Sequence, residues 1–227
     1  ADSGASIVFI HGHAGNRRQF MAEAAVYEEQ GYGLLLFDLR NHGESDDSLT
    51  TMGLHEVRDV QAAFAFLAAQ PDVDPERIAL YGHSMGAATA IRSMARIPEA
   101  RVLVASAPYS SMDRLLSDGV RRLTGGLLAF PFAAITREMM THMIDDDMGD
   151  VRPIDDIARI APRPVLIMHG TDDAIIPFAH SERLFAAAGE PKQFYAAIDA
   201  HHGNVYAAAP DVYAEQVLPF LEAALRG

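Results

Sequence analysis

The sequence predicts a single-domain α/β protein whose sheet is mostly parallel. Two observations lead to this prediction: short apolar, β-prone runs recur along the chain, and segments with helical character separate them. Such alternation favours a parallel sheet that is covered by helices on both faces. The length of 227 residues and the hydrophobic content of 49% are sufficient for one domain with a sizeable core.

Six apolar runs are expected to form the strands. Their continuous apolar character suits strands that are buried on both faces of a sheet. The runs span residues 6–10 (SIVFI), 33–37 (GLLLF), 77–81 (RIALY), 101–105 (RVLVA), 164–168 (PVLIM) and 193–198 (QFYAAI).

Five helix-like segments lie between or after these runs, at residues 17–30, 51–70, 84–97, 177–188 and 211–226. In the second segment Val57, Val60 and Phe64 recur at helical spacing and would face the sheet. Pro71 and Pro75 then interrupt the chain before the next strand.

One insertion interrupts the alternation. Residues 109–160 have helix-like sequence and contain no convincing strand. We interpret this segment as a helical cap over the C-terminal edge of the sheet. Because no repeat and no domain linker is visible, residues 1–227 are treated as one domain that carries this cap.

Charge and composition exclude several classes of protein. The net charge of −13 disfavours nucleic acid and anionic membrane surfaces as partners, since both attract basic patches. The absence of cysteine excludes disulfides and thiolate sites, and no apolar segment approaches the length for stable membrane insertion. The absence of a signal peptide favours a cytoplasmic location. A secreted or leader-processed form is the alternative, because the chain does not begin with methionine.

Residues 82–86 read GHSMG and fit the pattern G-x-S-x-G, with an apolar run before them and a helix-like segment after them. In this pattern the serine occupies a tight strand-to-helix turn, which needs small neighbours because the backbones pack closely there. The turn lifts the hydroxyl clear of the sheet, at the N-terminus of the helix. A glycine-flanked serine can also be a plain helix N-cap. The strand before it and the helix after it favour Ser84 as a nucleophile.

A serine hydroxyl is a weak nucleophile unless a positioned base removes its proton. If the order along the chain is serine, acid, histidine, the base lies near the C-terminus, where AIDAHHGN ends the last expected strand. His202, directly before Gly203, is favoured over His201, because two adjacent histidines cannot both point into one site. The alternative is a polar loop in which both histidines lie on the surface.

The acid that orients this imidazole should follow an earlier strand. Asp172 and Asp173 lie just beyond the run at 164–168, between Ser84 and His202 in the sequence. Either aspartate could instead stabilise a turn. Spacing alone does not choose between the two.

Ester cleavage also needs hydrogen-bond donors for the developing oxyanion. One expected donor is the backbone N–H of Met85, the residue after the nucleophile. The second should come from the loop HGHAGN at residues 11–16, where His13 is the best-placed donor. The alternative is a glycine-rich turn without a catalytic part.

A metal site is a rival interpretation of the same loops. His11, His13 and the residues around 172 and 201 supply imidazoles and carboxylates at strand ends. Zinc needs three or four convergent ligands, and the glycine pattern explains the first two histidines better. The acidic run at 145–150 lacks the full calcium-loop pattern. We therefore expect no metal or organic cofactor.

Several motifs together resemble the α/β-hydrolases, specifically the broad bacterial serine-hydrolase group with a helical cap. They are FIHGHAGN (9–16), LLFDLRNHGES (35–45), RIALYGHSMGAA (77–88), VLIMHGTDDAIIP (165–177) and DAHHGN (199–204). The resemblance implies Ser84 as nucleophile, His202 as base and Asp173, rather than Asp172, as acid. It implies that the backbones of His13 and Met85 form the oxyanion hole, and that Asp38, Arg40 and His42 brace loops.

The resemblance also implies a strand order of 2-1-3-4-5-6 and an antiparallel strand pair before the first strand. The chain has no room for that pair. We expect either a trimmed N-terminus or an unusually small protein, and a homodimer partner could supply the missing strands.

The expected function is a carboxylesterase that acts on small-molecule esters of short or medium acyl chain. Amide or peptide hydrolysis and lysophospholipase or monoacylglycerol lipase activity are the alternatives. A non-catalytic ligand-binding member of the fold is a weaker alternative, because all three triad residues are present. Candidate substrate-binding residues are Tyr109, after the run at 101–105, and Phe130, Met139 and Met143 in the cap. The cap residues could equally form the cap's own core.

Overall fold

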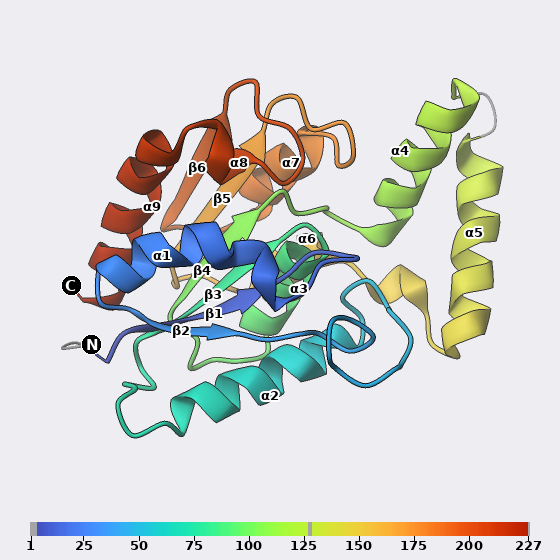
Figure 1. The fold of residues 1–227 in the computed structure, drawn as a ribbon. Coiled ribbons are helices and arrows are strands. Elements are labelled where there is room, and N and C mark those ends of the chain that lie inside the picture. The colour runs from blue at the N-terminus through green and yellow to red at the C-terminus, as the bar shows by residue number, and fades with distance from the viewer. Residues whose placement is uncertain (1–3, 127–128, 227) are drawn as a thin grey trace.

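The computed structural model describes residues 4–126 and 129–226, and within them six parallel strands form one sheet (Figure 1). The spatial order is β2-β1-β3-β4-β5-β6, which confirms the expected order. The strands are β1 (Ser6–Ile10), β2 (Gly33–Leu36), β3 (Ile78–His83), β4 (Val102–Ser106), β5 (Val165–Gly170) and β6 (Lys192–Ala197). Because all are parallel, their carboxyl ends meet at one edge of the sheet.

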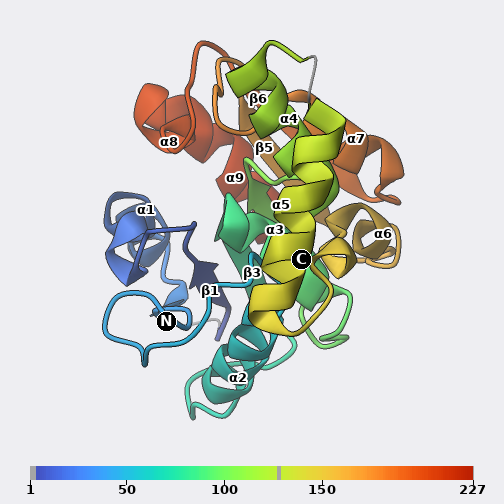
Figure 2. The same ribbon diagram turned by 90° about the vertical axis from the view of Figure 1, so that its right-hand side faces the viewer.

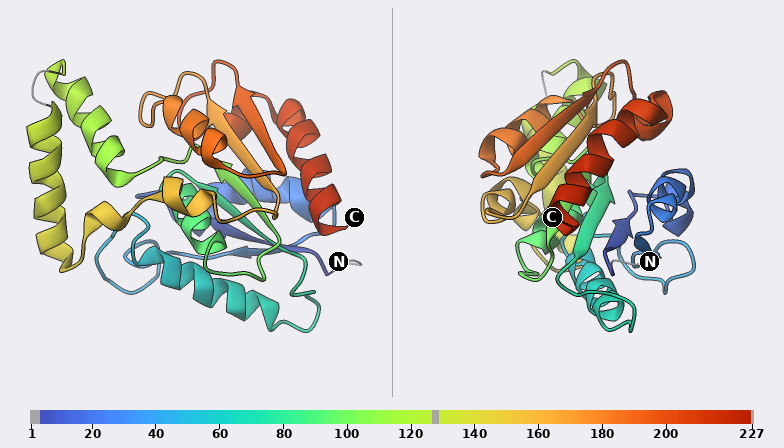
Figure 3. Two further views of the ribbon diagram at one scale, coloured as in Figure 1. Left: turned by 180° about the vertical axis from the view of Figure 1, so that it is seen from behind. Right: turned by 90° about the vertical axis from the view of Figure 1, so that its left-hand side faces the viewer.

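Helices cover both faces of the sheet. On the face toward the viewer in Figure 1 lie α1 (Met21–Glu29) and α9 (Pro210–Leu225). The opposite face, seen in the left view of Figure 3, carries α2 (Glu56–Ala68), α3 (Met85–Met94), α6 (Pro153–Ile157) and α7 (Ala179–Ala187). The remaining helices are η1 (Arg17–Phe20), α4 (Met112–Thr124), α5 (Ala129–Ile144), η2 (Met148–Asp150) and α8 (Val205–Ala208). In the described part of the chain, none combines the length and apolarity needed to cross a bilayer.

The continuous apolar runs of the strands serve two cores, one on each face. In β1, Val8 and Ile10 pack into the core shared with α2 and α3, whereas Ile7 and Phe9 pack into the core shared with α1 and α9. All four side chains are at most 1% exposed. Burial of one such side chain contributes about 1.5–3 kcal/mol, which explains why this strand carries no polar alternation.

Helix α2 begins five residues later than the expected segment at 51–70. The Glu56 carboxylate accepts hydrogen bonds from the N–H groups of Thr51 and Gly53, at 2.6 and 2.7 Å. Met52 and Gly53 have positive φ values of 52° and 88°, which a right-handed helix excludes. A turn closed by Glu56 therefore replaces the first helical turn.

The insertion at 109–160 divides into two parts. Helices α4 and α5 form a hairpin that stands beyond the carboxyl edge of the sheet (Figures 1 and 2). Helix α6 instead packs on the body, where Ile157 is fully buried and Asp156 lies 3.3 Å from the Arg92 guanidinium of α3. The hairpin is therefore the part of the insertion that stands out beyond the sheet edge, while the end of the insertion belongs to the main core.

A tyrosine cluster joins α1, β3 and α9 in the core on the face of the sheet that these two helices cover. The Tyr213 hydroxyl lies 2.5 Å from that of Tyr27 and 2.8 Å from that of Tyr81. The nearby Glu23 carboxylate has one buried oxygen, Oε2, without a hydrogen-bond partner among the described residues. Burial raises the pKa of Glu23 to about 7, against a weaker opposing effect of Tyr81.

This raised pKa predicts that Glu23→Gln stabilises the protein more at pH 8 than at pH 5. Above the unfolded-state pKa, the folded state binds the extra proton, so its stability falls as the pH rises through about 7. Glutamine cannot ionise, so the variant does not lose stability in this way as the pH rises. Urea unfolding at both pH values measures the difference, with the exposed Glu29→Gln on the same helix as the matched control. An equal change at the two pH values would contradict the prediction.

Candidate active site

Ser84 occupies the turn between β3 and α3 with φ 56° and ψ −120°, a conformation that non-glycine residues rarely adopt. Close packing surrounds the turn. A Cβ on Gly82 would overlap the Gly86 carbonyl, and a Cβ on Gly86 would overlap the Ile10 carbonyl of β1. Glycine is therefore required at both positions, because any side chain there would overlap neighbouring backbone atoms. The Ser84 side chain makes no N-cap hydrogen bond to α3, so the plain N-cap interpretation does not describe this residue.

The structure brings Ser84, His202 and Asp173 together. The Ser84 Oγ lies 3.0 Å from His202 Nε2, and His202 Nδ1 lies 2.7 Å from Asp173 Oδ2. An ionised carboxylate only accepts hydrogen bonds, so Nδ1 carries the imidazole proton and Nε2 is free to accept from the serine hydroxyl. This arrangement can withdraw the proton of Ser84.

The alternative residues point elsewhere. The Asp172 side chain is exposed, and its carbonyl lies 3.2 Å from Nδ1 of His201, which is also exposed. The structure therefore separates the two adjacent pairs: Asp173 and His202 face Ser84, while Asp172 and His201 lie together at the surface.

Asp173 is a fully buried carboxylate that two backbone amides and two imidazoles surround. Its Oδ1 accepts from the N–H groups of Ile175 and Ile176, at 2.8 and 2.9 Å, and its Oδ2 lies near His202 and His169. Burial acts to raise the pKa of Asp173, but hydrogen bonds from His169, His202 and Ile176 outweigh it and hold the pKa well below its ordinary value. The carboxylate is therefore ionised beside His202.

Around the nucleophile turn and the loop after β1, the backbone N–H groups of His13, Met85 and Gly86 have no hydrogen-bond partner among the described residues. The N–H groups around His13 are occupied. Gly12 donates to Gln19 Oε1 at 2.8 Å, and Ala14 donates to His42 Nε2 at 3.2 Å. The amides on either side of His13 thus have partners, and that of His13 is available as a donor.

This chain matches the model of the alpha/beta hydrolase family over residues 7–216. It belongs to the α/β-hydrolase family. Similar proteins include the uncharacterized YfhR of Salmonella typhi, 29% identical over 225 residues (97% of this chain, 72% of the relative). An uncharacterized protein of Mycobacterium tuberculosis is 34% identical over 194 residues (85% of this chain, 60% of the relative). The fold resembles the esterase Pf2001 of Pyrococcus furiosus, with a TM-score of 0.77 and 22% identity over 98% of this chain and 83% of that one.

Histidines and a carboxylate brace the loops beside the site in this α/β-hydrolase. His11 is fully buried, and its Nε2 accepts from the Leu39 N–H at 3.0 Å; burial lowers the pKa of His11. Asp38 accepts from the Arg17 N–H at 2.6 Å and pairs with its guanidinium at 2.7 Å. These bonds tie the loop after β1 to the loop after β2.

The substrate-binding prediction for Tyr109 is wrong. Its side chain is fully buried in the core, and its hydroxyl donates to the Met52 carbonyl at 2.6 Å, so it is not accessible to a substrate. The side chain of Phe130 lies outside the described residues. Met139 and Met143 are 62% and 69% exposed on α5, so they are not part of a cap core.

Sequence analysis did not identify two buried histidines near the triad, His83 and His169. The His83 ring centre lies 4.9 Å from that of His202, and burial lowers the pKa of His83 to about 3. A signal for both was present, since each lies within the last two residues of a strand, beside a glycine of the motifs already noted. Their burial could not be foreseen from that position.

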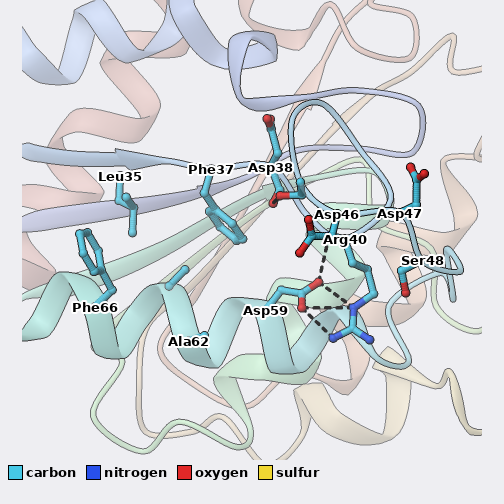
Figure 4. Close-up of a pocket in the computed structure, with 12 residues that line it drawn as sticks. Leu35, Phe37, Asp38, Arg40, Asp46, Asp47, Ser48, Asp59, Ala62 and Phe66 are labelled. Carbon is cyan, nitrogen blue, oxygen red and sulfur yellow. Dashed lines mark hydrogen bonds and ion pairs between the residues drawn. The ribbon is translucent and has the colours of Figure 1, made fainter.

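No group of three or more metal-ligating side chains occurs in residues 4–126 and 129–226 that could hold a metal ion. A hollow of about 690 Å³ lies away from the triad, between the end of β2, the following loop and α2 (Figure 4). Beside it Arg40 pairs with Asp59 at 2.7 Å. Ser84, Asp173 and His202 do not line this hollow.

The close contact at the nucleophile turn predicts that Gly86→Ala is strongly destabilising. The added Cβ would meet the backbone of β1, which cannot move without disturbing the sheet, and the cost is on the order of 2–4 kcal/mol. Gly119→Ala in α4 is the control, because a Cβ there meets nothing within 4 Å, and it should stabilise by about 0.5–1 kcal/mol. Denaturant unfolding compares the two; wild-type stability of Gly86→Ala would refute the contact argument.

Proposed function

We propose that this α/β-hydrolase is a serine hydrolase that cleaves carboxylic esters of short to medium acyl chain. The observation that carries the proposal is the continuous hydrogen-bonded series from Ser84 Oγ through His202 to buried Asp173, at 3.0 and 2.7 Å. A serine on a strained turn, with a base and an acid supplied by two other loops, is what nucleophilic acyl transfer needs. The esterase description of the similar Pyrococcus furiosus structure agrees with it.

In the proposed mechanism His202 takes the Ser84 proton through Nε2 while Asp173 holds the imidazole by its Nδ1–H. Ser84 Oγ attacks the ester carbonyl. The N–H groups of His13 and Met85 donate to the resulting oxyanion. The alcohol leaves with the proton from His202, and water releases the acid from the acyl-enzyme by the same steps.

An exposed apolar stripe on α5 supports the proposal that the substrate carries an acyl chain. Phe132, Ile135, Met139 and Met143 follow each other at helical spacing along α5, and each is at least 48% exposed. Exposed apolar side chains that gather on one helix face commonly mark a binding surface. The stripe also makes monoacylglycerol or lysophospholipid esters the second candidate class, because their long acyl chains would cover more of it.

The triad proposal predicts unequal effects of two neighbouring substitutions. Asp173→Asn should lower kcat on the order of 10³- to 10⁴-fold, because the imidazole loses the acceptor that sets its tautomer. Asp172→Asn should change kcat by less than about twofold, since its side chain is exposed to solvent. Steady-state kinetics on one ester measures both, and a reversed order of the two variants would refute the assignment of the acid.

Hydrolysis of p-nitrophenyl esters of increasing acyl length tests the function itself. We expect activity that is highest at short to medium chains and falls by several orders of magnitude in Ser84→Ala and His202→Ala, with the fold retained. A maximum at long chains would select the second candidate class. Folded wild-type protein that cleaves anilides but no esters would replace the proposal with an amidase.

A further inference from the structure

A second histidine contacts the carboxylate of the triad. Asp173 Oδ2 lies 2.7 Å from His202 Nδ1 and 3.1 Å from His169 Nε2. His169 stands near the end of β5, and the side chains of His169 and Asp173 are both 0% exposed. One carboxylate oxygen therefore faces two imidazoles, of which only His202 reaches Ser84.

The neighbours of His169 determine where its proton lies. Its Nε2 is 2.9 Å from the Ile176 carbonyl as well as 3.1 Å from Asp173. Both groups are acceptors, so Nε2 must carry the proton. The Nδ1 lies 2.6 Å from Ser181 Oγ, and this nitrogen, without a proton, accepts from the serine hydroxyl. The ring is thus held at both ends, and its Nε2, whose N–H donates to the Ile176 carbonyl, also lies 3.1 Å from Asp173 Oδ2.

We infer that His169 is a positioning residue for the triad acid, which holds Asp173 Oδ2 in line with His202 Nδ1. This inference rests on the proposed function. Asp173 Oδ1 is already fixed by the amides of Ile175 and Ile176. The N–H of His169 is a second contact to Oδ2 beside that of His202, so rotation of the carboxylate away from His202 would also separate it from His169.

The N–H of His169 also shares the negative charge of the carboxylate. Among the interactions that lower the pKa of Asp173, the hydrogen bond from His169 ranks before that from His202. The other titratable groups that face this pair are His83 of β3 and His180 of α7, and burial lowers the pKa of both. Without the His169 N–H, the negative charge of Asp173 would act more strongly on His202 and would stabilise the protonated form of the His202 imidazole.

The test compares His169→Met with His169→Gln. Methionine removes the donor, whereas glutamine retains one N–H donor and one acceptor. We expect His169→Met to lower kcat about 10- to 100-fold, as for loss of a hydrogen bond to a charged group, with KM nearly unchanged. The pH at which kcat/KM reaches half its maximum on the acid side should rise. Glutamine should restore most of kcat and the wild-type pH profile.

Two controls separate positioning from simple core damage. His180→Met also removes a fully buried histidine, on α7, whose ring bonds to Ser110 rather than to Asp173. The acid-side pH profile of this variant should therefore stay that of the wild type. In an Asp173→Asn background, adding His169→Met should cost no further kcat, because the shared partner is gone. Near-ultraviolet circular dichroism confirms that each variant is folded.

The inference is overturned if His169→Met keeps wild-type kcat, if glutamine and methionine are equally impaired, or if His180→Met moves the pH profile as much. Additive losses in the Asp173→Asn background would overturn it as well. These outcomes differ from failure of the proposed function, in which wild-type protein would lack ester hydrolysis or Ser84→Ala would retain it.

Discussion

The contact between the start of α3 and the end of β1 is the constraint on which the rest of the site depends. Ser84 can hold its positive φ only because Gly82 and Gly86 let the two backbones meet without a side chain between them. The register pairs Ile10 of β1 directly with Gly82 of β3. Ser84, the loop after β1 and the N-terminus of α3 are therefore positioned by one piece of backbone packing rather than by separate side-chain contacts.

A second close approach does the same for the acid and the base. A Cβ on Gly170, the last residue of β5, would overlap the Ala200 carbonyl. The loops after β5 and β6 are joined there, because the Asp172 N–H donates to that carbonyl at 3.0 Å. Asp173 and His202 lie just beyond this junction, in the loops that follow the neighbouring parallel strands β5 and β6. This backbone hydrogen bond thus keeps the loops that carry Asp173 and His202 side by side, which brings the two side chains close together.

Local patterns were sufficient to predict the strands, their order and the meeting of Ser84, Asp173 and His202, because each depends on a short motif and on parallel topology. Features that depend on distant packing were not predictable. The delayed start of α2 requires the Glu56 carboxylate to accept from the turn before the helix. The burial of Tyr109 depends on the Met52 carbonyl, which lies 57 residues away along the chain. The division of the insertion into two parts depends on the ion pair between Asp156 of α6 and Arg92 of α3.

The carboxyl edge of the sheet uses histidine as a rigid connector. A neutral imidazole offers one donor and one acceptor at fixed positions of a flat ring, so it can join two backbone segments without adding a charge. His11 joins the Leu39 N–H to the Gly12 carbonyl, and His42 joins the Ala14 N–H to the Arg40 carbonyl. A lysine or aspartate at either place would bring an uncompensated charge into a buried setting. The neutral rings of His11 and His42 therefore join the loops after β1 and β2 without placing a charge between them.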